Sequence, residues 1–154
     1  MFQTATRRVT ATPRRGRVVQ RTKHLVAALN EFAPGTRRLV TINGRSIGVF
    51  NIEGRFFALR SLCPHQGAPL CLGRIVGTNV ATAPYEYVYA REGEIIKCPW
   101  HGWEFDIATG QSVFNPHRVR IQTYDVTVED PADIDPSIET YPVTVEGEIV
   151  VVHV

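Results

Sequence analysis

The sequence has few cysteines and no long run of apolar residues. Three cysteines in 154 residues cannot form a closed disulfide framework, which favours a reducing compartment. The longest apolar tract, 149–154, is far shorter than the about eighteen residues that a membrane span requires. No apolar stretch follows the N-terminal arginines, as a secretory signal would need. We therefore expect a cytoplasmic protein without a membrane span, although an Arg-rich, acid-poor start is also typical of mitochondrial transit segments.

Acidic residues are scarce in the first part of the chain. Residues 1–60 hold 12 Lys and Arg against 2 acids, whereas residues 61–154 hold 5 against 13, so the two parts carry about +10 and −8. Basic segments can bind nucleic acid. Here the basic part lacks interleaved aromatic residues, and the acidic part can neutralise it once the chain folds. We expect a solvated basic tail over residues 1–22 and no nucleic-acid partner.

Short segments with strand-like composition, separated by tight turns, make up most of the sequence. The turns Asn43-Gly44 and Glu53-Gly54 follow one another closely, which predicts a meander of antiparallel strands. The sequence therefore predicts an all-β fold. The predicted strands are Arg38–Ile42, Ser46–Ile52, Arg55–Leu62, Glu94–Cys98, Trp103–Asp106, Ile121–Val128, Thr140–Val145 and Glu148–Val154.

Other segments give weaker patterns. Residues 24–32 predict a short helix or turn that Pro34-Gly35 ends. Residues 77–92 and 130–137 contain turn formers and few periodic apolar residues, so we expect both to be irregular surface excursions. Two alternating stripes predict strand faces that are buried in the core, namely Tyr124, Val126 and Val128, and Tyr141, Val143 and Val145.

Two short segments carry the chemistry: Cys63-Pro64-His65-Gln66-Gly67 and Cys98-Pro99-Trp100-His101-Gly102-Trp103. Each supplies one thiolate and one imidazole, with a proline that restricts the backbone and a glycine that permits a close turn. Two thiolates on one iron and two imidazoles on a second iron are the ligands of a Rieske centre. A tetrahedral Cys2His2 zinc site uses the same donors, and a catalytic cysteine beside a histidine is a further alternative.

At these residues the sequence resembles the Rieske family, whose signature is Cys-x-His followed by Cys-x-x-His. Trp103–Asp106 and Thr109-Gly110 are similar to the usual continuation of that family, and the resemblance extends over about 25–154. It implies a Rieske-type fold, in which an antiparallel β base domain carries a small inserted cluster-binding subdomain. We accordingly expect one domain over residues 23–154, with the cluster-binding part at about 62–116.

The resemblance implies a [2Fe-2S] cluster and assigns its four ligands. Cys63 and Cys98 would hold one iron, and His65 and His101 would hold the other near the protein surface, where an imidazole edge gives an electron its exit.

Three departures identify the branch of the family. Respiratory Rieske proteins carry an extra cysteine in each loop, where this chain has Ala68 and Trp100, and a serine where it has Trp103. The chain therefore resembles the ferredoxin and oxygenase branch. Fewer hydrogen-bond donors to the cluster predict a reduction potential toward the low end of the roughly −150 to +300 mV Rieske range. The 32 residues between His65 and Cys98 are about twice the number expected for that branch, which indicates an insertion at 77–92.

The remaining candidate residues suggest ordinary roles. Cys71 is expected to be a small buried hydrophobic residue and not a fifth ligand. Trp100 and Trp103 are expected to shield the cluster from water. His117 is expected to lie exposed in a proline-containing loop, and His24 and His153 are expected to be incidental.

The chain leaves no room for an oxygenase active site, because a non-haem iron needs two further histidines and a carboxylate. It also lacks the GxGxxG fingerprint of dinucleotide-binding proteins, so it should not take electrons directly from a nicotinamide. We expect a Rieske ferredoxin-like carrier that relays single electrons from a reductase to a terminal oxygenase or oxidase. The alternatives are an accessory or regulatory subunit, similar to the small subunit of assimilatory nitrite reductases, and a zinc-stabilised Cys2His2 interaction module.

Overall fold

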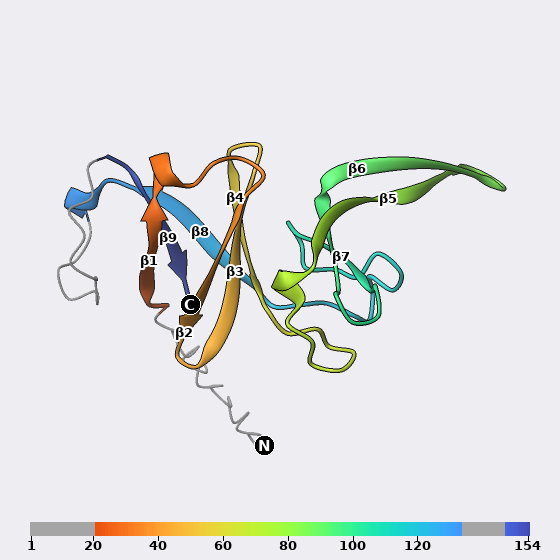
Figure 1. Ribbon diagram of the computed structural model, residues 1–154, viewed down its shortest axis with the longest axis horizontal. Helices are drawn as coiled ribbons and strands as arrows, with labels where there is room; N and C mark the ends of the chain where they lie inside the picture. The colour runs from red at the N-terminus through yellow and green to blue at the C-terminus, as the bar shows by residue number, and fades with distance from the viewer. Residues whose placement is uncertain (1–20, 134–146) are drawn as a thin grey trace, which may run out of the picture.

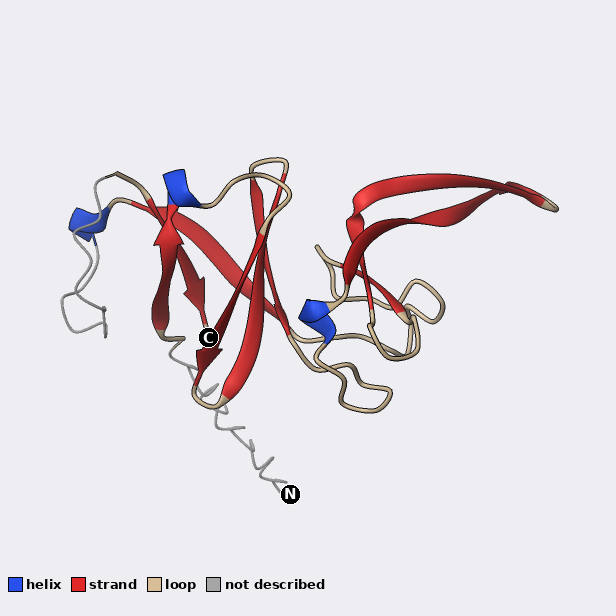
Figure 2. Ribbon diagram, viewed as in Figure 1, coloured by secondary structure: helices blue, strands red, loops and turns tan. Residues whose placement is uncertain are grey.

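The computed structural model describes residues 21–133 and 147–154, and most of its regular structure is antiparallel β-strand (Figures 1 and 2). The all-β prediction is confirmed. The strands are β1 (Lys23–Ala28), β2 (Arg37–Ile42), β3 (Arg45–Ile52), β4 (Arg55–Arg60), β5 (Arg74–Ala83), β6 (Glu86–Lys97), β7 (Glu104–Asp106), β8 (Thr123–Glu129) and β9 (Ile149–His153). Single 3₁₀ turns lie at Leu29–Glu31, Leu70–Leu72 and Pro131–Asp133.

Six strands form a base sheet in the order β1-β9-β8-β4-β3-β2. The two edge strands, β1 and β2, also contact each other. The sheet packs around a core of buried side chains that includes Phe32, Ile47 and Val150. Both predicted tight turns are present. Asn43 and Gly44 have φ values of 50° and 72°, as a two-residue hairpin with right-handed twist requires.

Residues 61–122 are an insertion between two strands of this base. β4 pairs directly with β8, with Ala58 opposite Tyr124, although residues 61–122 lie between the two strands in sequence. The inserted residues carry the second sheet, in the order β5-β6-β7, to one side of the base (Figure 1). A second buried core, with Phe50 and Leu59 from the base and Ile96 and Phe105 from the insertion, joins the two parts.

The helix or turn predicted for residues 24–32 is wrong for most of that segment. Residues Lys23–Ala28 form strand β1, which pairs with β9, and only Leu29–Glu31 form a 3₁₀ turn. The backbone hydrogen bonds between Thr22 and Val154 continue this pairing. Pairing with a strand more than a hundred residues away decided the conformation, and no local pattern reports such a partner.

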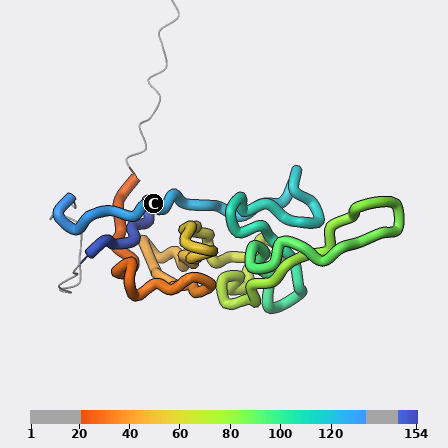
Figure 3. Tube along the Cα trace, turned by 90° about the horizontal axis from the view of Figure 1, so that it is seen from above, coloured from red at the N-terminus to blue at the C-terminus, as the bar shows by residue number. Residues whose placement is uncertain are grey.

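The irregular excursion predicted for residues 77–92 is also wrong, although the segment does lie on the surface. It forms most of a long hairpin of β5 and β6 that projects beyond β7 and away from the base sheet (Figures 1 and 3). Residues 78–90, hereafter the arm, have almost every side chain exposed. Alternation of apolar and polar residues marks a strand with one buried face. Because both faces of the arm meet solvent, that signal is missing.

The predicted core stripe on β8 is correct only at its start. Tyr124 is buried, Val126 is partly buried and Val128 is 40% exposed. The second stripe and the strand predicted at 140–145 lie outside the described residues, as do 1–20 of the predicted tail and 134–137 of the predicted excursion. Among the described residues, no helix has the length and apolar character needed to cross a membrane.

Candidate metal centre

The first Cys-His segment forms a closed loop immediately after β4. The Cys63 N–H donates to the carbonyl of Ala68 at 2.9 Å, and the Gly67 N–H donates back to the Cys63 carbonyl at 2.8 Å. Gly67 has a φ of 77°, a conformation that favours glycine. The loop buries the Cys63 side chain and leaves His65 exposed at its tip.

The second segment repeats this arrangement immediately after β6. The Cys98 N–H donates to the carbonyl of Trp103 at 2.7 Å, and the Gly102 N–H donates to the Cys98 carbonyl at 3.0 Å. Gly102 has a φ of 73°. The cysteine is again buried and the histidine, His101, is again exposed. The two loops therefore share one backbone design, although the histidine stands two residues after the cysteine in the first and three in the second.

The two cysteines of the loops are unpaired thiols in a buried environment, with 1% and 3% of Cys63 and Cys98 exposed. Burial raises the pKa of Cys63, and the neighbouring Cys98 thiol raises it further. The backbone amides of His65 and Gln66 oppose this shift because they donate to the Cys63 sulfur. The chain thus presents two adjacent sulfurs, one of which already has amide donors directed at it.

The two histidines of the loops also lie together. The ring centroids of His65 and His101 are 4.8 Å apart, and the rings are nearly perpendicular at 78°. Both side chains are exposed, so an imidazole edge is open to an approaching protein. The loops thereby bring all four predicted residues into two like pairs, one of thiols and one of imidazoles.

A tryptophan from the second loop contacts a histidine from the first. The Trp103 ring stacks on His65 with centroids 4.4 Å apart and an angle of 11° between the planes. Trp103 is partly buried, packs against the core that joins the base and the insertion, and covers one face of His65. Trp100 is 56% exposed and meets His101 only edge-on, with centroids 6.4 Å apart. The spacing of the motif does not reveal this difference between the two tryptophans.

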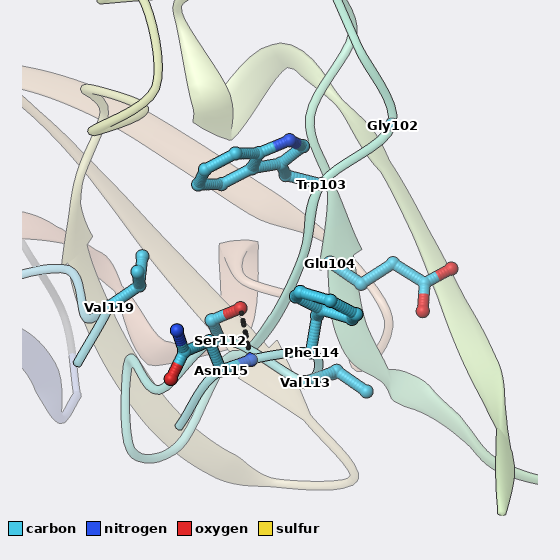
Figure 4. Close-up of a pocket in the computed structure, with 8 residues that line it drawn as sticks. All are labelled: Gly102, Trp103, Glu104, Ser112, Val113, Phe114, Asn115 and Val119. Atoms are coloured by element: carbon cyan, nitrogen blue, oxygen red, sulfur yellow. Dashed lines mark hydrogen bonds between the residues drawn. The ribbon is translucent and has the colours of Figure 1, made fainter. Parts of the chain in front are cut away.

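A cavity of about 590 Å³ lies against Trp103. Figure 4 shows the Trp103 ring on one side of it and Phe114 and Asn115 on the other. The Asn115 N–H donates to the Ser112 hydroxyl at 3.2 Å, which closes the turn at the start of the proline-containing loop. His117 of this loop is exposed, as predicted.

The third cysteine belongs to the core. Cys71 is fully buried, its N–H donates to the Ser61 hydroxyl at 3.0 Å, and its thiol lies 3.7 Å from the Leu59 carbonyl oxygen. A Cβ added at Gly48 would come within 2.6 Å of its sulfur. Cys71 therefore fills space between the base sheet and the insertion, as predicted.

The chemistry of the donor set fits a two-iron cluster. Two thiols and two imidazoles, paired by kind, match the division of ligands between the two irons of a Rieske centre. Within residues 21–133 and 147–154, no group of three or more His, Cys, Asp or Glu side chains is placed to hold a single metal ion.

Comparison with known proteins identifies the family. The Rieske [2Fe-2S] domain matches residues 22–125. The chain is 30% identical, over 68% of its length and 85% of the relative's, to the ferredoxin component of naphthalene 1,2-dioxygenase/salicylate 5-hydroxylase systems of a Ralstonia species. It is 27% identical, over 80% of its length and 85% of the relative's, to the ferredoxin component of an alkene monooxygenase system of Xanthobacter autotrophicus.

Solved structures agree with these sequence matches. The ferredoxin of carbazole 1,9a-dioxygenase from Nocardioides aromaticivorans superposes with a TM-score of 0.55 at 25% identity, over 84% of this chain and 96% of that one. A Sphingomonas yanoikuyae ferredoxin superposes with a TM-score of 0.52 at 32% identity, over 71% of this chain and 92% of that one. The chain therefore belongs to the Rieske [2Fe-2S] domain family, and its cofactor is a [2Fe-2S] cluster.

Proposed function

We propose that this protein carries single electrons from a reductase to a terminal oxygenase. In this proposal Cys63 and Cys98 hold one iron of the cluster, and His65 and His101 hold the other. Residues 23–154 act as one Rieske domain whose cluster-binding part is about 62–116. The free thiols at all three cysteines support a reducing compartment, and we assign the protein to the cytoplasm.

The placement of the four donors carries the proposal. Two buried thiols lie behind two exposed imidazoles, so the site is enclosed on its sulfur side and open on its histidine side. The cluster supplies a one-electron couple when it is bound. The exposed rings of His65 and His101 give a docked partner a short route to the site, and the thiols stay out of solvent.

The chain's own residues prepare this site in three ways. The matched backbone hydrogen bonds of the two loops set the direction of each cysteine before metal arrives. The amides of His65 and Gln66 favour the anionic form of the Cys63 sulfur, which is the form that binds iron. Trp103 holds the plane of His65 and excludes water from one of its faces.

The relatives support the choice of partner. Several are ferredoxin components of dioxygenase or monooxygenase systems, and the chain spans about 85% of their length, so it has the extent of a ferredoxin. Ala68 and Trp100 stand where respiratory Rieske proteins carry their disulfide, and all three cysteines are free. This supports a low-potential carrier and not a respiratory-chain subunit.

Electron paramagnetic resonance of the dithionite-reduced protein tests the proposal, with iron and zinc measured in the same sample. The expected result is a rhombic signal with an average g of about 1.9, which is typical of a cluster with both His and Cys ligands. The iron content should be about two atoms per chain. One equivalent of zinc and no signal would refute the cluster assignment.

The carrier role is tested with the purified reductase and terminal oxygenase of a naphthalene dioxygenase system as surrogate partners. We expect the holoprotein to be reduced in the presence of the reductase and NADH, and to be reoxidised by the oxygenase with substrate and oxygen. A protein that holds the cluster but remains oxidised with every reductase tried would argue for an accessory subunit.

A further inference from the structure

We infer that the arm joins two copies of this protein into a homodimer through its tyrosine-bearing face. The inference concerns self-association and goes beyond the carrier role. The arm occupies most of the segment where the sequence predicts an insertion, and it extends freely from the body of the molecule (Figures 1 and 3). The exposure and the composition of the arm both indicate a surface that another molecule covers.

The arm concentrates exposed apolar surface. Five of the eleven exposed large hydrophobic side chains in the described part of the chain belong to it, and the other six are distributed over several elements. The five are Val80 (39% exposed), Tyr85 (97%), Tyr87 (70%), Val88 (53%) and Tyr89 (57%). The three tyrosines alone expose roughly 350–550 Å², at 150–250 Å² for a whole aromatic side chain. That is as large as the largest apolar patch on a typical monomer.

The arm also lacks the features that normally protect an isolated ribbon. A two-stranded hairpin is marginally stable in water, and natural edge strands carry charges, above all lysine, to prevent pairing. Residues 76–90 contain one charged side chain, Glu86, and no lysine. The base of the arm is nevertheless held in place, because the Arg91 guanidinium donates to Glu94 at 2.9 Å and to Asp106 of β7. The arm is therefore a fixed projection with an unprotected surface.

Two tyrosines share one face of the arm. Tyr89 lies opposite Asn79 and Tyr87 lies opposite Ala81, and directly opposed residues share a face of an antiparallel pair. This tyrosine face therefore places two aromatic rings on β6 beside the shorter side chains of Asn79 and Ala81 on β5. The Tyr89 hydroxyl accepts the Gly77 N–H at 2.7 Å, which fixes that ring. A second copy can pack its two rings over these shorter side chains.

The near absence of charged side chains on the arm favours a second copy of this chain over a redox partner as the molecule that covers it. Transient redox complexes are small and are steered by complementary charges. Homodimer interfaces are more apolar, are depleted of charge at their centre and are rich in tyrosine. The tyrosine face has the second composition, and two such uncharged faces meet without charge repulsion. Tyr87 and Tyr89, 70% and 57% exposed, supply roughly 200–300 Å² at 150–250 Å² for a whole aromatic side chain. The smaller side chains of the face and the ribbon backbone would supply the rest of the roughly 800 Å² that each partner buries in a standard interface.

Sedimentation equilibrium and light scattering of the holoprotein test the inference, from about 1 µM to about 200 µM, a range that brackets micromolar dissociation constants. We expect wild type to be dimeric and Tyr87→Lys to raise the dissociation constant by at least roughly 30-fold, as an interface hot spot does. Phe114→Lys is the matched control, because Phe114 is 96% exposed outside the arm. It should leave the dimer intact.

Cluster absorption reports folding of each variant. If Tyr87→Lys fails to fold, hydrogen exchange of wild type replaces it, and amides 78–90 should be more protected at the high concentration than at the low one. A wild-type protein that stays monomeric throughout the range would overturn the inference and leave the arm for another partner. A dimer that Tyr87→Lys does not weaken, or amides 78–90 equally protected at both concentrations, would overturn it as well.

Discussion

Replacing Trp103 tests how the two loops act together, because its ring belongs to the second loop and stacks on His65 of the first. Trp103→Leu removes the flat surface against the imidazole and admits water to that face. Reduction adds negative charge to the cluster, and a more polar environment stabilises that charge. We therefore expect the reduction potential of Trp103→Leu to rise.

The structure bounds the size of this rise. An aromatic stacking contact is worth about 0.5–1.5 kcal/mol, and a one-electron potential moves by about 59 mV for each 1.4 kcal/mol. The full contact thus corresponds to about 20–60 mV. Only the part that differs between the two redox states counts, so about 60 mV is the upper limit of the rise.

A redox titration followed by circular dichroism measures the potential, and the spectrum of the reduced protein shows that the cluster is intact. Trp100→Leu is the matched control. Its ring is 56% exposed and contacts His101 only edge-on, so its potential should stay within about 10 mV of wild type on the same stacking scale. Equal shifts in the two variants, or no shift in Trp103→Leu with the cluster retained, would refute the reasoning.

Three further predictions concern ligation, packing and pH. Cys98→Ser should lose the visible absorption and the iron of the cluster. Cys71→Ala should retain both and lose about 1–2 kcal/mol of unfolding free energy in a urea titration, because it only removes a buried side-chain atom. Loss of iron from Cys71→Ala would contradict the assignment of Cys71 to the core. Gly73→Ala would place a Cβ 1.9 Å from a main-chain carbonyl oxygen and should cost about 3 kcal/mol in a urea titration. The control Gly54→Ala meets only backbone strain, at φ +83°, and should cost about 1 kcal/mol. Burial alone would raise the pKa of Asp106, but hydrogen bonds from its arginine partner and a backbone amide hold it below the ordinary value of 3.8. The carboxylate therefore adds stability that is complete above about pH 4 and declines as the pH falls through the lowered pKa. The difference in unfolding free energy between wild type and Asp106→Asn should accordingly shrink between pH 7 and pH 3. A difference that does not change with pH would contradict this reasoning.

The form of the two Cys-His loops was predictable because its information is local. Each cysteine stands within three residues of its histidine, and the glycine that closes each loop follows within four residues of the cysteine. A short loop with such fixed spacing adopts the same hydrogen bonds wherever the fold places it. The hairpin at Asn43-Gly44 was predictable for the same reason, since a turn that needs positive φ selects its own residues.

The arm shows where local information failed. Residues 77–92 were predicted to be irregular because alternation of apolar and polar residues was the criterion, and a ribbon exposed on both faces has no need to alternate. A weaker signal was present, since tyrosine recurs at every second position from 85 to 89. An aromatic residue at every second position is typical of a β-strand, whichever face is buried.

By itself the sequence determined the donor set, the closed form of the two loops and the all-β class, because neighbouring residues and tight turns decide these properties. Only the tertiary structure decided that β1 is a strand, that Trp103 and not Trp100 stacks on a histidine, and that Cys71 packs between the base sheet and the insertion. Each of these depends on contact between segments that are distant in sequence, and such contacts exist only after the base sheet and its insertion have packed together.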